Sequence, residues 1–146
     1  MKKFALVAAG AALFASSQFA AAENHVVKAS VTNFDPMVIF VQPGDSVTWS
    51  NMNGHNVETI PGMIPEGAEA FSSKLGEEGY TVTFDVEGAY VYKCLPHVST
   101  GMVGTVVVGS NPSNMDAIDA ALGDVKIAKN MVGRAIKKTK KAIAAQ

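Results

Sequence analysis

The chain is predicted to fold as an antiparallel β-sandwich followed by two α-helices. Residues 23–110 contain short runs rich in Val, Thr, Tyr and Phe, separated by Gly and Pro turn signals, which is typical of a small all-β domain. Residues 111–146 instead carry apolar residues at helical spacing together with most of the lysines. A length of 146 residues fits a single domain.

The first 22 residues are expected to be a secretory signal peptide. Two lysines follow Met1, an apolar run extends from Phe4 to Phe14, and small residues lead to Ala22. This is the three-part signal pattern with an A-x-A-like cleavage site, and the run is too short to span a bilayer comfortably. An uncleaved anchor is the alternative. We therefore expect one domain of residues 23–146 in the periplasm, with no later membrane span.

Seven segments are expected to be strands because their residues favour extended backbone and turn signals bound them. They are residues 26–31, 38–41, 46–49, 56–60, 81–84, 89–94 and 103–108. Residues 62–74 show no alternation and are expected to form a loop. A series of short strands at this spacing predicts a sandwich rather than a parallel sheet.

Two amphipathic helices are expected after residue 110. Ser113 stands three residues before Asp116, as in a capping box, and Asp124 is a candidate cap for the second helix after Gly123. The apolar positions at helical spacing are Met115, Ile118, Leu122, Val125, Ala128, Val132, Ala135 and Ile136. Lysines crowd the last turns, where cations suit the helix dipole. We interpret both helices as packed on the sandwich, the alternative being a membrane-surface or partner-docking helix.

Charge is unevenly spread along the chain. Residues 23–110 hold ten acidic and three basic groups, a net of −7, whereas residues 111–146 hold three acidic and seven basic groups, a net of +4. A basic tail can indicate nucleic-acid binding. Export argues against that partner, and the helical pattern explains the lysines as a solvated helix end.

The candidate functional residues are a thiol, two imidazoles and a thioether. Cys94 is the single cysteine of an expected exported chain, so it cannot form an internal disulfide and needs another explanation. Cys94, His97 and Met102 lie on one loop between two predicted strands, and His55 begins another strand. Two His and one Cys with a distant axial Met describe a blue-copper electron-transfer site. Pro96 restricts the loop backbone between the first two of these residues.

Three stretches carry a family resemblance: residues 54–60, 62–71 and 93–104. They resemble the cupredoxin family of blue copper proteins, and within it the pseudoazurins, which also have two C-terminal helices. The resemblance implies a Greek-key sandwich and one copper ion cycling between Cu(I) and Cu(II). Its implied ligands are His55, Cys94, His97 and Met102. It further implies that Asn56 ties the ligand loops together and that Asn33 helps to position the cysteine loop.

The resemblance also implies an electron carrier that is not itself an enzyme. We expect a monomer that meets periplasmic redox proteins transiently, either a copper nitrite reductase or cytochromes. His97 is expected to face solvent as the exit for the electron, inside an apolar rim of Met63, Pro65 and Pro96. Of the lysines that typically ring this histidine, Lys74 and Lys93 match, whereas Asn53 replaces one, which predicts a weaker charged docking patch.

Four other interpretations compete with electron transfer. Copper storage or delivery would use exposed Met or Cys clusters on flexible segments, whereas here the ligands lie in a short loop. A zinc enzyme needs an open coordination position, which four protein ligands do not leave. A cysteine hydrolase needs an orienting third group, and none is apparent near Cys94. A purely structural module, in which the Cys and His residues are accidental, is the fourth. Separately, Glu23-Asn24-His25 of the processed chain is a candidate for an incidental Cu(II) site, and a histidine at a strand edge is the preferred interpretation there.

Overall fold

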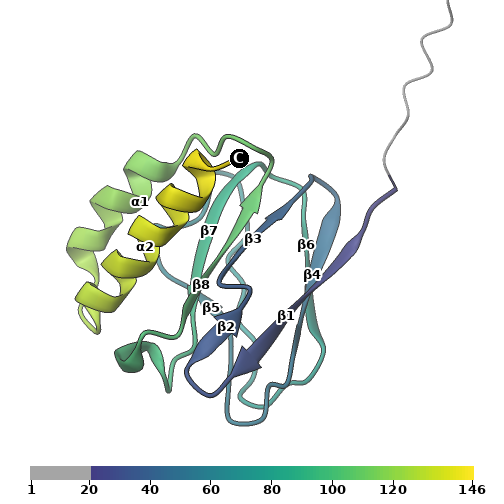
Figure 1. Ribbon diagram of the computed structural model, residues 1–146, viewed down its shortest axis with the longest axis vertical. Helices are drawn as coiled ribbons and strands as arrows, with labels where there is room; N and C mark the ends of the chain where they lie inside the picture. The colour runs from purple at the N-terminus through teal and green to yellow at the C-terminus, as the bar shows by residue number, and fades with distance from the viewer. Residues whose placement is uncertain (1–20) are drawn as a thin grey trace, which may run out of the picture.

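The computed structural model describes residues 21–146, which form two β-sheets packed face to face with two helices against one of them (Figure 1). The predicted sandwich with two C-terminal helices is confirmed. The predicted signal peptide lies outside the described residues, apart from Ala21 and Ala22. Within residues 21–146 we find no helix whose length and apolar character would let it cross a membrane.

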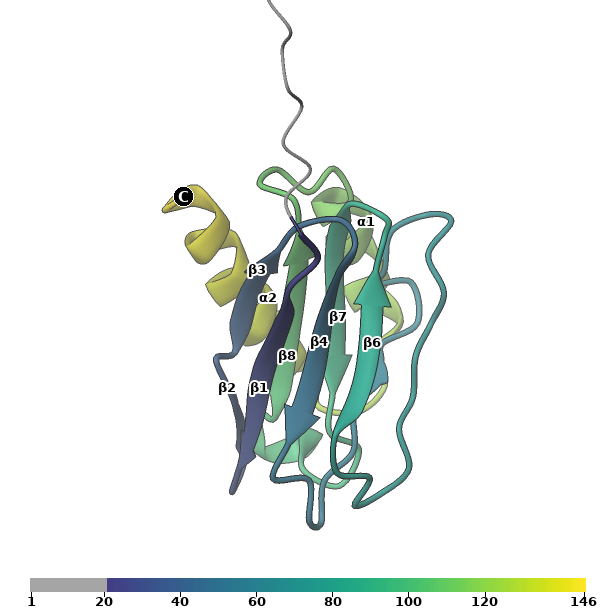
Figure 2. The same ribbon diagram turned by 90° about the vertical axis from the view of Figure 1, so that its right-hand side faces the viewer.

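Each sheet has four strands. The first has the order β2-β1-β4-β6 and is formed by β1 (Asn24–Ser30), β2 (Asn33–Asp35), β4 (Asp45–Ser50) and β6 (Tyr80–Phe84). The second has the order β3-β8-β7-β5 and is formed by β3 (Val38–Val41), β5 (Glu58–Thr59), β7 (Gly88–Lys93) and β8 (Val103–Val108). Figure 2 looks onto the first sheet, with the second behind it.

The expectation of a wholly antiparallel sandwich was wrong in two places. Strand β1 pairs with β4 in parallel, and β3 pairs with β8 in parallel. Parallel neighbours cannot be joined by a tight hairpin, and here the chain passes through the opposite sheet between them. The expected strand at 56–60 is shortened to Glu58–Thr59. Strand β2 was missed because Asn33 and Asp35 are residue types depleted in strands.

An aromatic cluster fills the space between the sheets. Trp49 and Tyr92 are both fully buried, with their rings 5.2 Å apart in an edge-on arrangement. Phe34 lies 4.9 Å from Tyr92, and Phe71 lies 5.5 Å from Trp49. Such tilted and edge-on pairs are favourable because the positive ring edge meets the negative face. This core lies directly beneath the end of β7, where Cys94 follows the strand.

The helices α1 (Met115–Ala121) and α2 (Lys129–Ala144) cover the outer face of the second sheet (Figure 1). Ile118, Val132 and Ile136 are buried there in a second apolar cluster. The hydroxyls of Thr105 on β8 and Thr139 on α2 are hydrogen bonded at 2.8 Å within this interface. All six residues of β8 are buried as a result, because the sandwich core covers one face and α2 the other. The interpretation of packed amphipathic helices is therefore confirmed.

Both predicted helix caps were wrong. Asn114 occupies the first cap, and its side chain does not cap the helix but bonds the backbone N and O of Ala89, each at 2.8 Å. A capping box was expected at Ser113. The structure instead has the side chain of Asn114 hydrogen bonded to β7. Asp124 ends a short 3-10 turn, η2 (Leu122–Asp124), and α2 begins only after Ala128, whose φ is 58°.

The carboxylate of Asp45 links the start of β1 to the turn before β4 through hydrogen bonds. Its carboxylate accepts hydrogen bonds from the backbone N–H of Glu23 and Gln42, each at 2.8 Å, and contacts His25 Nε2 at 2.9 Å. These hydrogen bonds, the backbone ones first, lower the pKa of Asp45 to about 2. The Glu23 carbonyl also accepts from Ser46 N at 2.8 Å, so the N-terminal segment considered above as a Cu(II) chelator is paired into the sheet.

Because the pKa of Asp45 is lower in the folded state, its stabilisation is present above the ordinary carboxyl pKa of 3.8 and is lost as pH falls toward about 2. Asp45→Asn is expected to lower the free energy of unfolding by about 2 kcal/mol at neutral pH, and by much less below about pH 3. Urea denaturation at both pH values measures this difference. Glu66→Gln is the control, since Glu66 is exposed. An equal loss from Asp45→Asn at both pH values would contradict the assignment.

Candidate metal centre

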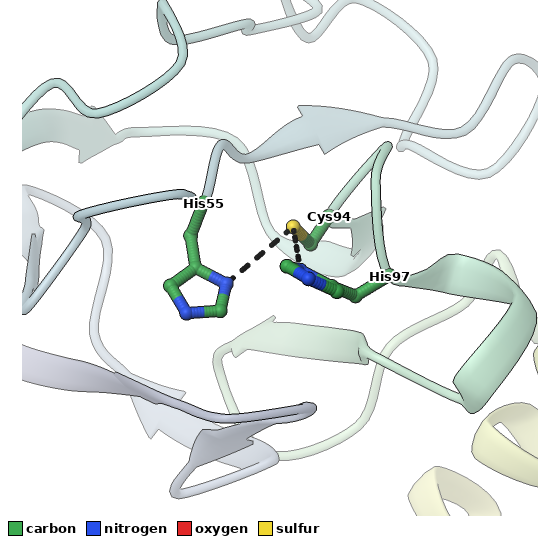
Figure 3. A group of neighbouring side chains, drawn as sticks. All are labelled: His55, Cys94 and His97. Carbon is green, nitrogen blue, oxygen red and sulfur yellow. Dashed lines mark hydrogen bonds between the residues drawn. The ribbon is translucent and has the colours of Figure 1, made fainter.

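Three candidate ligand atoms converge at one end of the sandwich. Cys94 Sγ lies 3.4 Å from His97 Nδ1 and 3.7 Å from His55 Nδ1, and the ligand atoms of the three residues all lie within 4.8 Å of one another. Figure 3 shows the sulfur of Cys94 joined by dashed lines to one ring nitrogen of His55 and one of His97. Among residues 21–146 this is the single group of three or more such residues with this spacing.

The cysteine loop is closed by its own backbone. Cys94 N donates to Met102 O at 3.0 Å, which continues the antiparallel pairing of β7 and β8 past their ends. Between them lies the 3-10 turn η1 (Val98–Thr100), followed by Gly101 with φ 100°, a conformation that glycine adopts without strain. The loop therefore returns to β8 within a few residues, and this short path keeps the side chains of Cys94 and His97 close together.

The second ligand loop is tied to the first by Asn56. Its Oδ1 accepts a hydrogen bond from Leu95 N at 2.7 Å, which links the residue after His55 to the residue after Cys94. This is the link that the family resemblance implied. His55 itself is held at both backbone groups, since its N–H donates to Met52 O and its carbonyl accepts from Gly76 N, each at 2.8 Å.

Met102 lies beside these residues in the core. It is fully buried, belongs to the same apolar cluster as Cys94, and its N–H donates to His97 O at 3.2 Å. The fourth predicted ligand is thus anchored by backbone hydrogen bonds to two of the others. The structure brings all four predicted residues to one end of the molecule.

The donor set fits a small first-row transition metal. With bonds of about 2.3 Å to sulfur and about 2.0–2.1 Å to nitrogen, a trigonal plane separates S from N by about 3.8 Å. The two S–N separations are 3.7 and 3.4 Å, close to that value. One thiolate and two imidazoles are ligands that suit copper in both oxidation states.

The two histidines differ in their surroundings. His55 is 7% exposed, and burial, followed by the positive charge of His97, lowers its pKa. The neutral imidazole favoured in this way is the form that binds a metal. His97 is only partly buried, in agreement with its expected position at the surface.

The predicted apolar rim around His97 was wrong for two of its three residues. Met63 is 0% exposed and lies in the cluster beneath the helices. Pro65 is buried against Gly88, at the opposite end of β7 from Cys94, and six strand residues span roughly 20 Å. Directly before His97 in the chain, Pro96 is exposed as predicted, and the exposed apolar residue that the prediction omitted is Leu95, which is 52% exposed. Their position between Cys94 and His97 was the signal available in the sequence.

Two further predictions concern residues around the site. Asn33 is exposed on β2, and among the described residues its side chain makes no hydrogen bond to the cysteine loop, so the positioning role implied for it is not observed. Lys93 pairs with Glu58 at 3.2 Å, which offsets its charge, whereas Lys74 is exposed. This supports the expectation of a weak charged patch.

The chain is similar to known copper-binding proteins. Residues 20–109 match the model of a family described as copper binding proteins, plastocyanin/azurin family. Pseudoazurin of Paracoccus pantotrophus is 40% identical over 123 residues, which cover 80% of this chain and 84% of that protein. The crystal structure of pseudoazurin from Methylobacterium extorquens AM1 is 36% identical with a TM-score of 0.69, covering 82% of this chain and 98% of that one. Native pseudoazurin from Hyphomicrobium denitrificans is 30% identical with a TM-score of 0.65, covering 79% and 97%.

Proposed function

Because the chain belongs to the plastocyanin/azurin family of copper-binding proteins, and within it to the pseudoazurins, we propose that it carries single electrons through one copper ion. The proposed ligands are His55, Cys94, His97 and Met102. The observation that carries the proposal is the buried thiol of Cys94 held between two imidazoles on mutually braced loops. Copper, when bound, supplies a couple between Cu(I) and Cu(II).

The protein contributes a fixed ligand set and a short path to the surface. Asn56 joins the two loops, and backbone hydrogen bonds hold His55 and Cys94. We therefore expect the ligands to keep one arrangement in both oxidation states. This rigidity favours electron transfer over copper delivery, which needs ligands that can leave. With four protein ligands no coordination position remains for a substrate, so we propose a carrier rather than an enzyme.

The partner is proposed to contact the exposed edge of His97 together with Leu95 and Pro96. A small apolar contact suits a short-lived redox encounter, which buries little surface. Since Glu58 offsets the charge of Lys93, the encounter is expected to depend only weakly on salt. We propose periplasmic partners, a copper nitrite reductase or cytochromes, for a monomeric carrier released from its signal peptide.

Optical spectroscopy of the processed, Cu(II)-loaded protein tests the function. We expect an intense thiolate-to-copper band that bleaches with one electron per protein and returns on mixing with oxidised nitrite reductase or cytochrome. A protein that binds copper without that band would support copper handling instead.

Two variants test the contact surface. Leu95→Asp should slow the bimolecular reaction, whereas Val26→Asp makes the same charge change at an equally exposed residue, 54% against 52%, on strand β1. Equal rates for both variants would exclude Leu95 from the contact.

A further inference from the structure

The loop that carries His55 leaves β4 through a turn in which two consecutive amides meet one carboxylate. Asn51 N donates to Glu78 Oε1 and Met52 N donates to Glu78 Oε2, each at 2.8 Å. Asn51 has φ 59°, a left-handed conformation that L-residues seldom adopt. Successive N–H groups beside a left-handed residue form a concavity that favours an anion. Here the anion is the side chain of Glu78.

A short chain of hydrogen bonds connects this carboxylate to His55. The carbonyl of Met52, whose N–H is bound by Glu78, accepts from His55 N at 2.8 Å. The side chain of Met52 is 0% exposed and belongs to the sandwich core. One residue thus stands between Glu78 and the backbone of His55, and that residue is anchored on its other side by packing.

The segment that bears Glu78 brackets the same loop on both sides. Gly79 N donates to Trp49 O at 3.0 Å before the turn, and Gly76 N donates to His55 O at 2.8 Å after it. Glu78 lies between these two contacts in the chain, and its exposed side chain reaches the turn through the two hydrogen bonds from Asn51 and Met52. Its hydrogen bonds from Met52 and then Asn51 lower its pKa, so the carboxylate is ionised at neutral pH.

We propose that Glu78 is a positioning residue, which holds the 51–55 turn so that His55 stays in place beside Cys94. The role rests on the proposed function of His55 as a ligand. Glu78 has no contact with the ligand atoms and acts through the backbone of Met52. A ligand on a turn fixed by hydrogen bonds keeps its position at the metal. A ligand on a mobile turn exchanges between positions and releases its metal sooner.

The test compares Glu78→Ala with Glu78→Gln. Both remove the negative charge, but the glutamine retains one oxygen that can accept an amide hydrogen bond. Glu66→Ala is the control, because Glu66 is exposed and lies outside the bracket. The comparison therefore separates the loss of charge from the loss of the hydrogen bonds.

The first readout uses the metal-free protein. Amide hydrogen exchange at Met52 and His55 is expected to be about tenfold faster in Glu78→Ala, less so in Glu78→Gln and unchanged in Glu66→Ala. Unchanged exchange at both amides, or an equal acceleration at every amide, would overturn the positioning role. If Glu78→Ala does not fold, Glu78→Gln alone decides between these outcomes.

The second readout uses the Cu(II)-loaded protein. Glu78→Ala is expected to lose copper to a chelator several-fold faster and to shift the thiolate-to-copper band, with Glu78→Gln between it and the unsubstituted protein. Unchanged copper loss and an unchanged band in a folded Glu78→Ala would overturn the proposal. If the unsubstituted protein shows no such band, the proposed function fails, and that result is distinct from any change in amide exchange.

Discussion

Cys94→Ser is expected to abolish the intense visible band and the reversible one-electron couple of the copper-loaded protein. Cys94 is fully buried between His55 and His97, and the chain has no second cysteine that could supply a thiolate. A serine hydroxyl is a harder donor and does not ionise near neutral pH, so it cannot form the copper–thiolate bond. Absorption spectroscopy and voltammetry of the loaded protein measure both losses.

His25, the one histidine outside the proposed centre, supplies the matched control for the loss of the visible band. His25 lies at the start of β1 beside Asp45, away from the cluster, so His25→Gln should leave the band unchanged while His55→Gln weakens or removes it. Near-ultraviolet circular dichroism of each metal-free variant verifies that the sandwich is retained. Persistence of the band in Cys94→Ser would show that the chromophore involves another residue and would remove the basis for the proposed centre.

Gly104→Ala is expected to lower the free energy of unfolding by about 3 kcal/mol, through overpacking. A Cβ at this position would lie 2.4 Å from both Cζ and Oη of Tyr92. The ring of Tyr92 is fully buried and packed against Phe34 and Trp49, so it has nowhere to move. Urea denaturation of the metal-free protein measures the loss.

Gly123→Ala is the control for a glycine substitution, because nothing lies within 4 Å of its Cβ position. The complementary test shortens the side chain that the new Cβ would meet. Tyr92→Leu combined with Gly104→Ala should lower the free energy of unfolding by less than the sum of the two single substitutions. A cost for Gly104→Ala equal to that of Gly123→Ala would mean that β8 moves to make room.

Local chemistry along the chain was sufficient to predict most of the strands and the residues of the candidate metal centre. The β-branched runs at 38–41 and 103–108 became β3 and β8 with the expected limits, because strand preference and bounding turns are properties of neighbouring residues. The ligand set was predictable for a related reason. Cys94, His97 and Met102 share one loop, and only His55 had to be brought to them from a distance.

Contacts between distant residues decided the rest. Met63 was predicted to lie in a loop and is buried because the helices cover it. Ser113 was predicted to cap the first helix, whereas Asn114 occupies the cap position and bridges to Ala89. The parallel pairings and the bracket of Glu78 around the His55 loop likewise join residues about 20 or more positions apart. Hydrophobic pattern and backbone propensity act over a few residues, whereas burial and hydrogen-bond partners depend on which surfaces meet once the sheets pack. The ligand types could therefore be predicted from the sequence, while the supports that hold the ligands emerged only from the packed structure.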